Sequence, residues 1–231
     1  MSLTIRSRAA EQMDADDLDP AIYARILADL AQVNSVTLAR LPTLAFLGRA
    51  LAGRRSLRLL DVGFGQGDML RSIARWAERR DIKAEPVGID LNPNSAPAAR
   101  AATPPDLPID FLTGDYADLA GERFDLIVSS LVAHHMRDSE LVGFLRFMEA
   151  EAAIGWLIND IHRLQLAHFG FPILARIMRW HRIVREDGTL SIARGFRPRE
   201  WTPYLEQAGI PAGAAQVVRR FPFRLCVERL R

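Results

Sequence analysis

Apolar residues along the chain form two kinds of pattern. Short, nearly continuous runs are typical of strands buried on both faces of a parallel sheet, whereas apolar positions three or four residues apart are typical of helices. The strand-like runs cover residues 57–62, 86–89, 109–112, 124–130 and 153–158. Helical patterns, such as those over 68–80 and 138–150, separate them. This alternation predicts an α/β fold, and two further runs, 214–219 and 221–228, predict a closing hairpin.

The chain before the first strand is predicted to be helical. From Pro20 onward the apolar positions recur on one helical face, and Asp19 directly before it is a suitable N-cap. A second helix is expected over residues 35–51 and should be divided at Pro42, because proline interrupts the helical hydrogen bonds.

Length and composition favour one domain with a sizeable core, since the chain has 231 residues and 49% of them are hydrophobic. Residues 1–19 are rich in aspartate and are expected to form a flexible leader. Residues 20–231 are expected to form a single domain, with N-terminal helices over 20–54 and an insertion over 161–196 that follows the fifth strand.

Charge and cysteine content exclude several classes of protein. No run of eighteen apolar residues occurs, and the N-terminus has no secretory signal. The single cysteine, Cys226, excludes an internal disulfide and a cysteine metal cluster, and we therefore expect a cytoplasmic protein. The formal charge is only +2, and the basic residues are scattered without an aromatic platform, which argues against nucleic acid as a partner.

A glycine-rich turn follows the first strand, where Asp61, Gly63, Gly65 and Gly67 alternate with other residues. Glycine lets a ligand approach the main chain closely. A dinucleotide site requires a G-x-G-x-x-G spacing, but here the position of its last glycine is Asp68. A carboxylate at that helix N-terminus disfavours a pyrophosphate, so the turn favours a nucleoside without phosphate.

This D-x-G-x-G-x-G pattern resembles motif I of the class I S-adenosylmethionine (SAM) methyltransferases. Residues 87–93, Val-Gly-Ile-Asp-x-x-Pro, resemble the second motif of the same family. The resemblance implies a Rossmann-like fold with a seven-stranded, mostly parallel sheet and an antiparallel last strand. It also implies a helical N-terminal segment, a helical lid after the fifth strand, and SAM as the cofactor, released as S-adenosylhomocysteine.

The resemblance assigns roles to residues at the ends of successive strands. Asp90 should accept hydrogen bonds from the ribose hydroxyls, and Asp115 should reach the exocyclic amine of adenine, with Tyr116 packed nearby. The residues expected to bind the cofactor are Asp61, Gly63, Phe64, Gly65, Gly67, Asp90, Leu91, Asp115, Tyr116 and Ser130.

The stretch after the fourth strand indicates the kind of acceptor. Residues 129–135, Ser-Ser-Leu-Val-Ala-His-His, lack the Asn/Asp-Pro-Pro-aromatic motif of methyltransferases that act on nitrogen atoms of bases or glutamine. They resemble the small-molecule branch, especially the ubiquinone and menaquinone biosynthesis type. This implies a small, apolar acceptor such as a phenol, a quinol or a natural-product intermediate, with O-methylation slightly favoured over C-methylation. The alternatives are a non-catalytic SAM-binding or regulatory module and an RNA or protein methyltransferase.

Methyl transfer to a phenol benefits from a base, and histidine is the residue matched to that task. The candidates for the base are His135 and His162, with Asp160 to orient the ring. His134, Arg163 and Arg194 are candidate substrate residues. Asn159 and Asp160 alone are too few for a metal site, so no metal is expected.

The insertion after the fifth strand is the most individual part of the chain. Gly170 and Pro172 predict a helix stop followed by a new helix, 172–180, with an apolar face opposite several arginines. The resemblance implies a roof over the substrate site. Packing on the sheet and contact with a membrane surface, if the acceptor is lipophilic, are the alternatives. The oligomeric state is left open.

Overall fold

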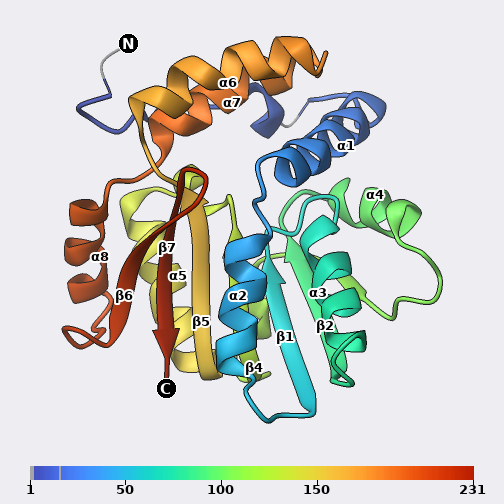
Figure 1. Cartoon of the computed structure of the whole chain (residues 1–231), viewed down its shortest axis with the longest axis vertical. Helices are drawn as coiled ribbons and strands as arrows, with labels where there is room; N and C mark the ends of the chain where they lie inside the picture. Colours follow the sequence, from blue (N-terminus) through green and yellow to red (C-terminus); the bar gives the residue numbers. More distant parts are fainter. Residues whose placement is uncertain (1–2, 16) are drawn as a thin grey trace.

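The computed structural model describes residues 3–15 and 17–231, and a seven-stranded sheet forms its centre (Figure 1). The strands are β1 (Ser56–Val62), β2 (Lys83–Asp90), β3 (Asp110–Thr113), β4 (Phe124–Ser130), β5 (Ala152–Ile161), β6 (Ala215–Arg220) and β7 (Arg224–Leu230). Their order is β3-β2-β1-β4-β5-β7-β6. Strands β1 to β5 pair in parallel, and β7 is antiparallel to both of its neighbours. The predicted sheet is therefore confirmed.

Helices cover both faces of the sheet because its strands are apolar on both sides. The helices are α1 (Pro20–Val36), α2 (Leu41–Ala50), α3 (Asp68–Glu78), α4 (Ser95–Ala102), α5 (Asp138–Glu151), α6 (Gln165–Ile177), α7 (Arg182–Arg194) and α8 (Trp201–Gln207). Leu59 of β1 faces the core under α2, α3 and α4, whereas the adjacent Leu60 faces the core under α5 and α8. This is the two-residue period that a strand imposes on its side chains.

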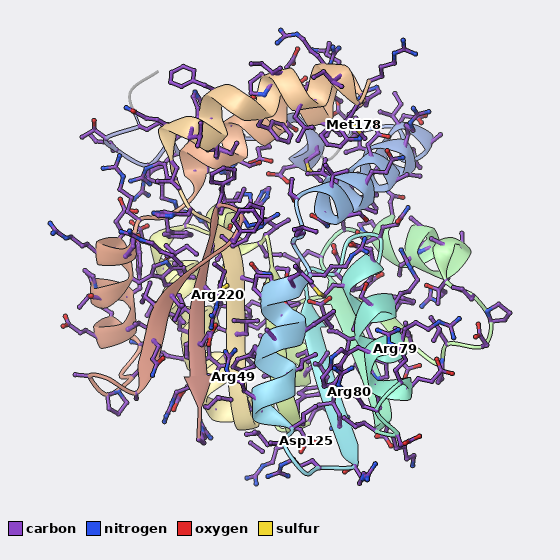
Figure 2. The ribbon with its side chains drawn as sticks, viewed as in Figure 1. Arg49, Arg79, Arg80, Asp125, Met178 and Arg220 are labelled. Carbon is purple, nitrogen blue, oxygen red and sulfur yellow. The ribbon has the colours of Figure 1, made fainter. Side chains whose placement is uncertain are left out.

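The roof of the molecule lies above the carboxyl ends of β1 and β2 (Figure 1). Helices α1, α6 and α7 form it and share an apolar cluster that includes Ile26, Ala175, Trp180 and Val184. In Figure 2, Met178 marks the end of α6 next to α1. Open α/β sheets bind ligands at the carboxyl ends of their strands, so the roof covers the place where a ligand is expected.

The predicted helix break at Gly170 and Pro172 is wrong, because α6 is continuous from Gln165 to Ile177. Packing in the roof compensates for the hydrogen bond that Pro172 removes, since Ala175 of the same helix is fully buried. Gly188 lies inside α7, where an added Cβ would overlap the ring of Phe171 in α6. The small residue therefore serves close helix packing.

Residues 3–15, expected as part of a flexible leader, lie against α7 and the turn after β4. The Arg6 side chain donates hydrogen bonds to the carbonyl groups of Ala133, His134, Met136 and Arg194. Glu11, the one acidic residue of this segment that is buried, packs beside α7. Asp16, one of the four leader aspartates, lies outside the described residues.

The antiparallel strand β7 is tied to elements on both sides by one buried carboxylate. Arg49 of α2 and Arg220 of β6, both labelled in Figure 2, form ion pairs with Glu228 of β7. Within the described residues, no helix is long and apolar enough to cross a membrane.

Candidate active site

The glycine turn after β1 places bare main chain at the edge of the sheet. Gly63, Gly65 and Gly67 have φ angles of +75°, +55° and +74°, in the left-handed region that favours glycine. A Cβ on Gly67 would lie 2.7 Å from the Phe111 ring, and one on Gly63 would overlap Val132. Backbone conformation therefore favours glycine at all three positions, and close packing requires it at Gly63 and Gly67.

Asp90, at the end of β2, faces this turn. One of its carboxylate oxygens accepts the Gly65 N–H at 2.9 Å, and the other accepts the Asn92 N–H at 2.9 Å. Each oxygen keeps a further lone pair, so the carboxylate can bind two hydroxyl groups of a ligand at once. Burial raises the pKa of Asp90, although these two N–H groups oppose the shift.

Two polar atoms at the floor of the site lack partners among the described residues. They are Oδ2 of Asp61 and Oγ of Ser130, both buried in residues that line the cavity described below. Burial raises the pKa of Asp61 well above its usual range, and the charges of the nearby Asp68 and Asp90 raise it further. A floor with three carboxylates suits a ligand that is cationic and rich in hydrogen-bond donors.

The remaining residues predicted to bind the cofactor surround the turn. Phe64 is buried against Phe111, and Leu91 is exposed at the cavity mouth. Tyr116 lines the cavity and packs against two phenylalanines of α5. Asp115 lies between two lining residues, and one of its oxygens accepts the Ala117 N–H at 2.9 Å. Its other oxygen remains for a ligand.

A cavity of about 1030 Å³ extends from the glycine turn to the roof. Single ligand sites typically enclose about 300–1,000 Å³, so this space accommodates two molecules side by side. The floor contributes Gly63, Asp90 and Ser130, the roof contributes Phe171, Val184 and Ser191, and the N-terminal segment contributes Glu11 and Asp14.

A buried histidine–aspartate pair, His134 and Asp160, contributes its histidine to the cavity lining. Nδ1 of His134 lies 2.7 Å from Oδ1 of Asp160, and the backbone N–H of His134 donates to Oδ2 at 2.9 Å. Burial alone would raise the pKa of Asp160, but His134 and the backbone N–H groups hold it below its usual range. An ionised Asp160 only accepts hydrogen bonds, so Nδ1 of His134 donates to it, and Nε2 is the ring nitrogen that faces away from Asp160.

His135 is held by the N-terminal segment. Its Nδ1 lies 2.9 Å from a carboxylate oxygen of Asp14. Burial alone would lower the pKa of His135, but the hydrogen bond with Asp14 and the nearby Glu11 raise it. Glu11 itself accepts a hydrogen bond from Ser191 at 2.8 Å, and its oxygens lie 3.8 Å from Nε2 of both histidines.

Glu11, His134 and His135 also form a group that could hold a metal ion, because their ligand atoms lie within 4.8 Å of one another. One carboxylate and two imidazoles are a ligand set that suits zinc. Asp160 and Asp14 already orient the two rings as outer carboxylates do in zinc sites. The sequence predicted no metal and did not point to this group.

Six predicted site residues do not line the cavity: Gly67, Asp115 and Asp160, which adjoin lining residues, and His162, Arg163 and Arg194. His162 is buried beside Phe196, and burial and then the charges of three nearby arginines lower its pKa. Arg163 donates to the carbonyl groups of Leu3 and Gly195 and pairs with Glu200. Arg194 donates to the carbonyl groups of His134 and Ala9.

Asp160 therefore orients a histidine, as expected, but this is His134, which we had assigned to the substrate, and neither His135 nor His162. Two cavity residues escaped the sequence analysis. Glu11 belongs to the segment expected to be solvated, and Arg224 begins the last strand without any motif. The acidic composition of the leader was the one available signal.

The comparisons with known proteins agree with this geometry. A family model described as a methyltransferase domain matches residues 59–151. A ubiquinone biosynthesis O-methyltransferase of Cereibacter sphaeroides is 38% identical over 161 residues, which cover 68% of this chain and 61% of that protein. The chain thus spans about three fifths of the length of this curated relative.

Solved structures show the same fold. Human N-acetylserotonin methyltransferase, crystallised with SAM, has a TM-score of 0.64 and 16% identity, covering 92% of this chain and 56% of that chain. Magnesium protoporphyrin IX methyltransferase from Synechocystis PCC 6803, with bound SAH, has a TM-score of 0.56 and 16% identity, covering 95% and 91%. Residues 59–151 thus match a methyltransferase domain, and the fold is shared with methyltransferases that were crystallised with SAM or SAH.

Proposed function

We propose that the protein transfers the methyl group of SAM to a hydroxyl group of a small phenolic or quinol acceptor. The observation that carries this proposal is the buried His134–Asp160 pair, whose histidine lines the same cavity as the glycine turn. The ubiquinone biosynthesis O-methyltransferases to which the chain is similar support oxygen as the methyl acceptor.

The residues of the glycine-turn half fit the cofactor. When bound, SAM supplies an electrophilic methyl group on a sulfonium ion. The glycine turn and Asp90 hold the nucleoside, with Asp90 as acceptor for the ribose hydroxyls. The free oxygen of Asp115 accepts from the adenine amine. The partnerless atoms of Asp61 and Ser130 accept from the cationic methionine part.

The base is His134. Asp160 fixes its ring, and Nε2 would take the proton of the acceptor hydroxyl as the oxygen bonds to the methyl carbon and the carbon–sulfur bond breaks, with S-adenosylhomocysteine as the leaving group. A phenol has a pKa of about 10, so it is protonated at neutral pH. Removal of its proton by His134 during the attack makes the oxygen more nucleophilic. The main chain and roof contribute by holding acceptor and methyl group in line.

The roof favours an apolar acceptor, because Phe171, Leu174 and Val184 line it. A lipophilic acceptor would also explain the outer side of α6. Leu166, Phe169, Ile173 and Ile177 recur at helical spacing there and are 62–72% exposed. We therefore include peripheral membrane contact in the proposal, and expect α6 variants with Ser at these positions to bind vesicles less tightly than the wild type. Equal binding by both would remove membrane contact from the proposal.

A cytoplasmic location is also part of the proposal, and it is supported by Cys226, which is a buried, free thiol.

The enzymatic proposal is tested by incubating the protein with methyl-labelled SAM and a panel of catechols, hydroxybenzoates and quinols. Labelled O-methyl products from the wild type, and their loss in His134→Gln, are expected. Tight SAM binding without any product from the panel would favour the non-catalytic SAM-binding module instead.

A further inference from the structure

Arg224 stands apart from the other buried arginines. It is the first residue of β7, next to Ile161 of β5, and only 5% of it is exposed. It nevertheless lines the cavity, on the side where Thr37 follows α1. A guanidinium group is thus buried in the protein and turned toward the space that a ligand fills.

The other two buried arginines are saturated by the protein. Arg163 has two backbone carbonyl groups and the carboxylate of Glu200 as partners. Arg194 has two backbone carbonyl groups and lies 3.7 Å from an oxygen of Glu11. Neither lines the cavity. Their hydrogen bonds therefore hold the N-terminal segment and the loop after α7 in place.

Arg224 has a single hydrogen bond, from Nη2 to the hydroxyl of Thr37 at 3.1 Å. Within residues 3–15 and 17–231 its Nε and Nη1 have no partner and it forms no ion pair. The buried carboxylate of Asp160, whose charge acts on Arg224, already accepts hydrogen bonds from His134 and from the Ile161 N–H. Burial lowers the pKa of Arg224, although the charge of Asp160 opposes the shift.

A buried charge without an opposite partner is costly, so such a group normally faces a ligand that neutralises it. A guanidinium presents parallel N–H donors that match the two oxygens of a carboxylate. We propose that Arg224 binds a carboxylate inside the cavity. This inference rests on the proposed function, because that function supplies two molecules with such a group: the methionine end of SAM and an acceptor of the hydroxybenzoate type.

The test compares Arg224→Met and Arg224→Lys with the wild type by titration calorimetry. The ligands are SAM, decarboxylated SAM, a dihydroxybenzoate and the catechol that lacks its carboxylate. Arg219→Met, an exposed arginine on the neighbouring strand β6, is the matched control. Thermal unfolding of each variant verifies that the fold is intact.

Arg224→Met should weaken one carboxylate-bearing ligand by about 10- to 100-fold, while its carboxylate-free counterpart binds as in the wild type. A loss confined to SAM assigns the cofactor as the source, and a loss confined to the benzoate assigns the acceptor. Arg224→Lys should recover part of the loss, since it keeps the charge but not the paired donors.

Unchanged affinities in folded Arg224→Met, or equal losses for both members of each pair, would overturn the role of Arg224. Failure of the proposed function is distinguishable, because it would appear as absent SAM binding by the wild type itself.

Discussion

His134 is fixed by Asp160 through two hydrogen bonds, one to its ring at 2.7 Å and one to its backbone at 2.9 Å. The two residues come from different strand ends: His134 lies in the short helix after β4, and Asp160 lies near the end of β5. Because β4 and β5 are parallel neighbours, their carboxyl ends meet at the same edge. The topology thus assembles the proposed base from residues 26 positions apart.

Replacing either member of this pair should slow methyl transfer. His134→Gln and Asp160→Asn are expected to lower kcat by about 10²-fold or more, since general-base catalysis typically contributes that much. Steady-state kinetics with a methylated phenol as product provides the measurement. His162→Gln, a buried histidine outside the cavity, is the matched control and should leave kcat close to the wild-type value. Comparable losses in His162→Gln and His134→Gln would refute the assignment of the base.

Comparison of Gly53→Ala with Gly67→Ala should separate the effect of backbone strain from the effect of damage to the cofactor site. Gly53→Ala places a Cβ at φ +78° with no atom within 4 Å, so it should cost about 1–2 kcal/mol of stability and no SAM affinity. Gly67→Ala has nearly the same φ, +74°, but meets Phe111. We expect it to lose more stability and most SAM binding, as measured by denaturant unfolding and calorimetry. Identical behaviour of the two variants would mean that the contact with Phe111 is unimportant.

The contact between His135 and Asp14 should make the docking of the N-terminal segment depend on pH. Because the pKa of His135 is raised, its contribution to stability is complete below about pH 6.5. The contribution disappears as the pH rises through the pKa that His135 has in the folded state. The difference in Tm between the wild type and His135→Gln should therefore shrink from pH 6 to pH 9.

His162 provides a control of opposite sign. Its lowered pKa means that its contribution is complete above about 6.5 and disappears as the pH falls through the folded-state value. The Tm difference for His162→Gln should hence shrink toward low pH. If the two Tm differences changed in the same direction with pH, the His135–Asp14 contact could not be the cause of the pH dependence.

Removal of divalent cations should leave methyl transfer intact, because the His134–Asp160 pair needs no metal to accept a proton. We expect equal rates with and without EDTA. If EDTA abolished the rate, and added zinc restored it in the wild type but not in Glu11→Gln, then Glu11, His134 and His135 would have to be reassigned as a metal site.

The sheet and the cofactor half of the cavity could be predicted from the sequence because both are encoded locally. Asp61, the three glycines and Asp90 stand at fixed distances from strand ends, and the strand pattern fixes their edge. Leu59 and Leu60 show why the strands were recognisable, since each is buried on its own face.

The acceptor half could not be predicted, because it is assembled from long-range contacts. Glu11 and Arg224 are 213 positions apart and carry no motif, yet both line the cavity. The histidine oriented by Asp160 was expected to be His135 or His162, whereas the parallel strands bring it His134. The continuous helix through Pro172 likewise depends on packing against α7 that no local pattern records.

The most direct test of the central claim is calorimetric titration of the wild type and Asp90→Ala with SAM and with NAD. The account predicts that the wild type binds SAM and not NAD, because the turn lacks the spacing for a pyrophosphate. Asp90→Ala should weaken SAM binding by about 1–3 kcal/mol through loss of the ribose hydrogen bonds, while Asp106→Asn, an exposed carboxylate that pairs with Arg75, should not. Binding of NAD instead of SAM, or equal SAM affinity in wild type and Asp90→Ala, would contradict the account.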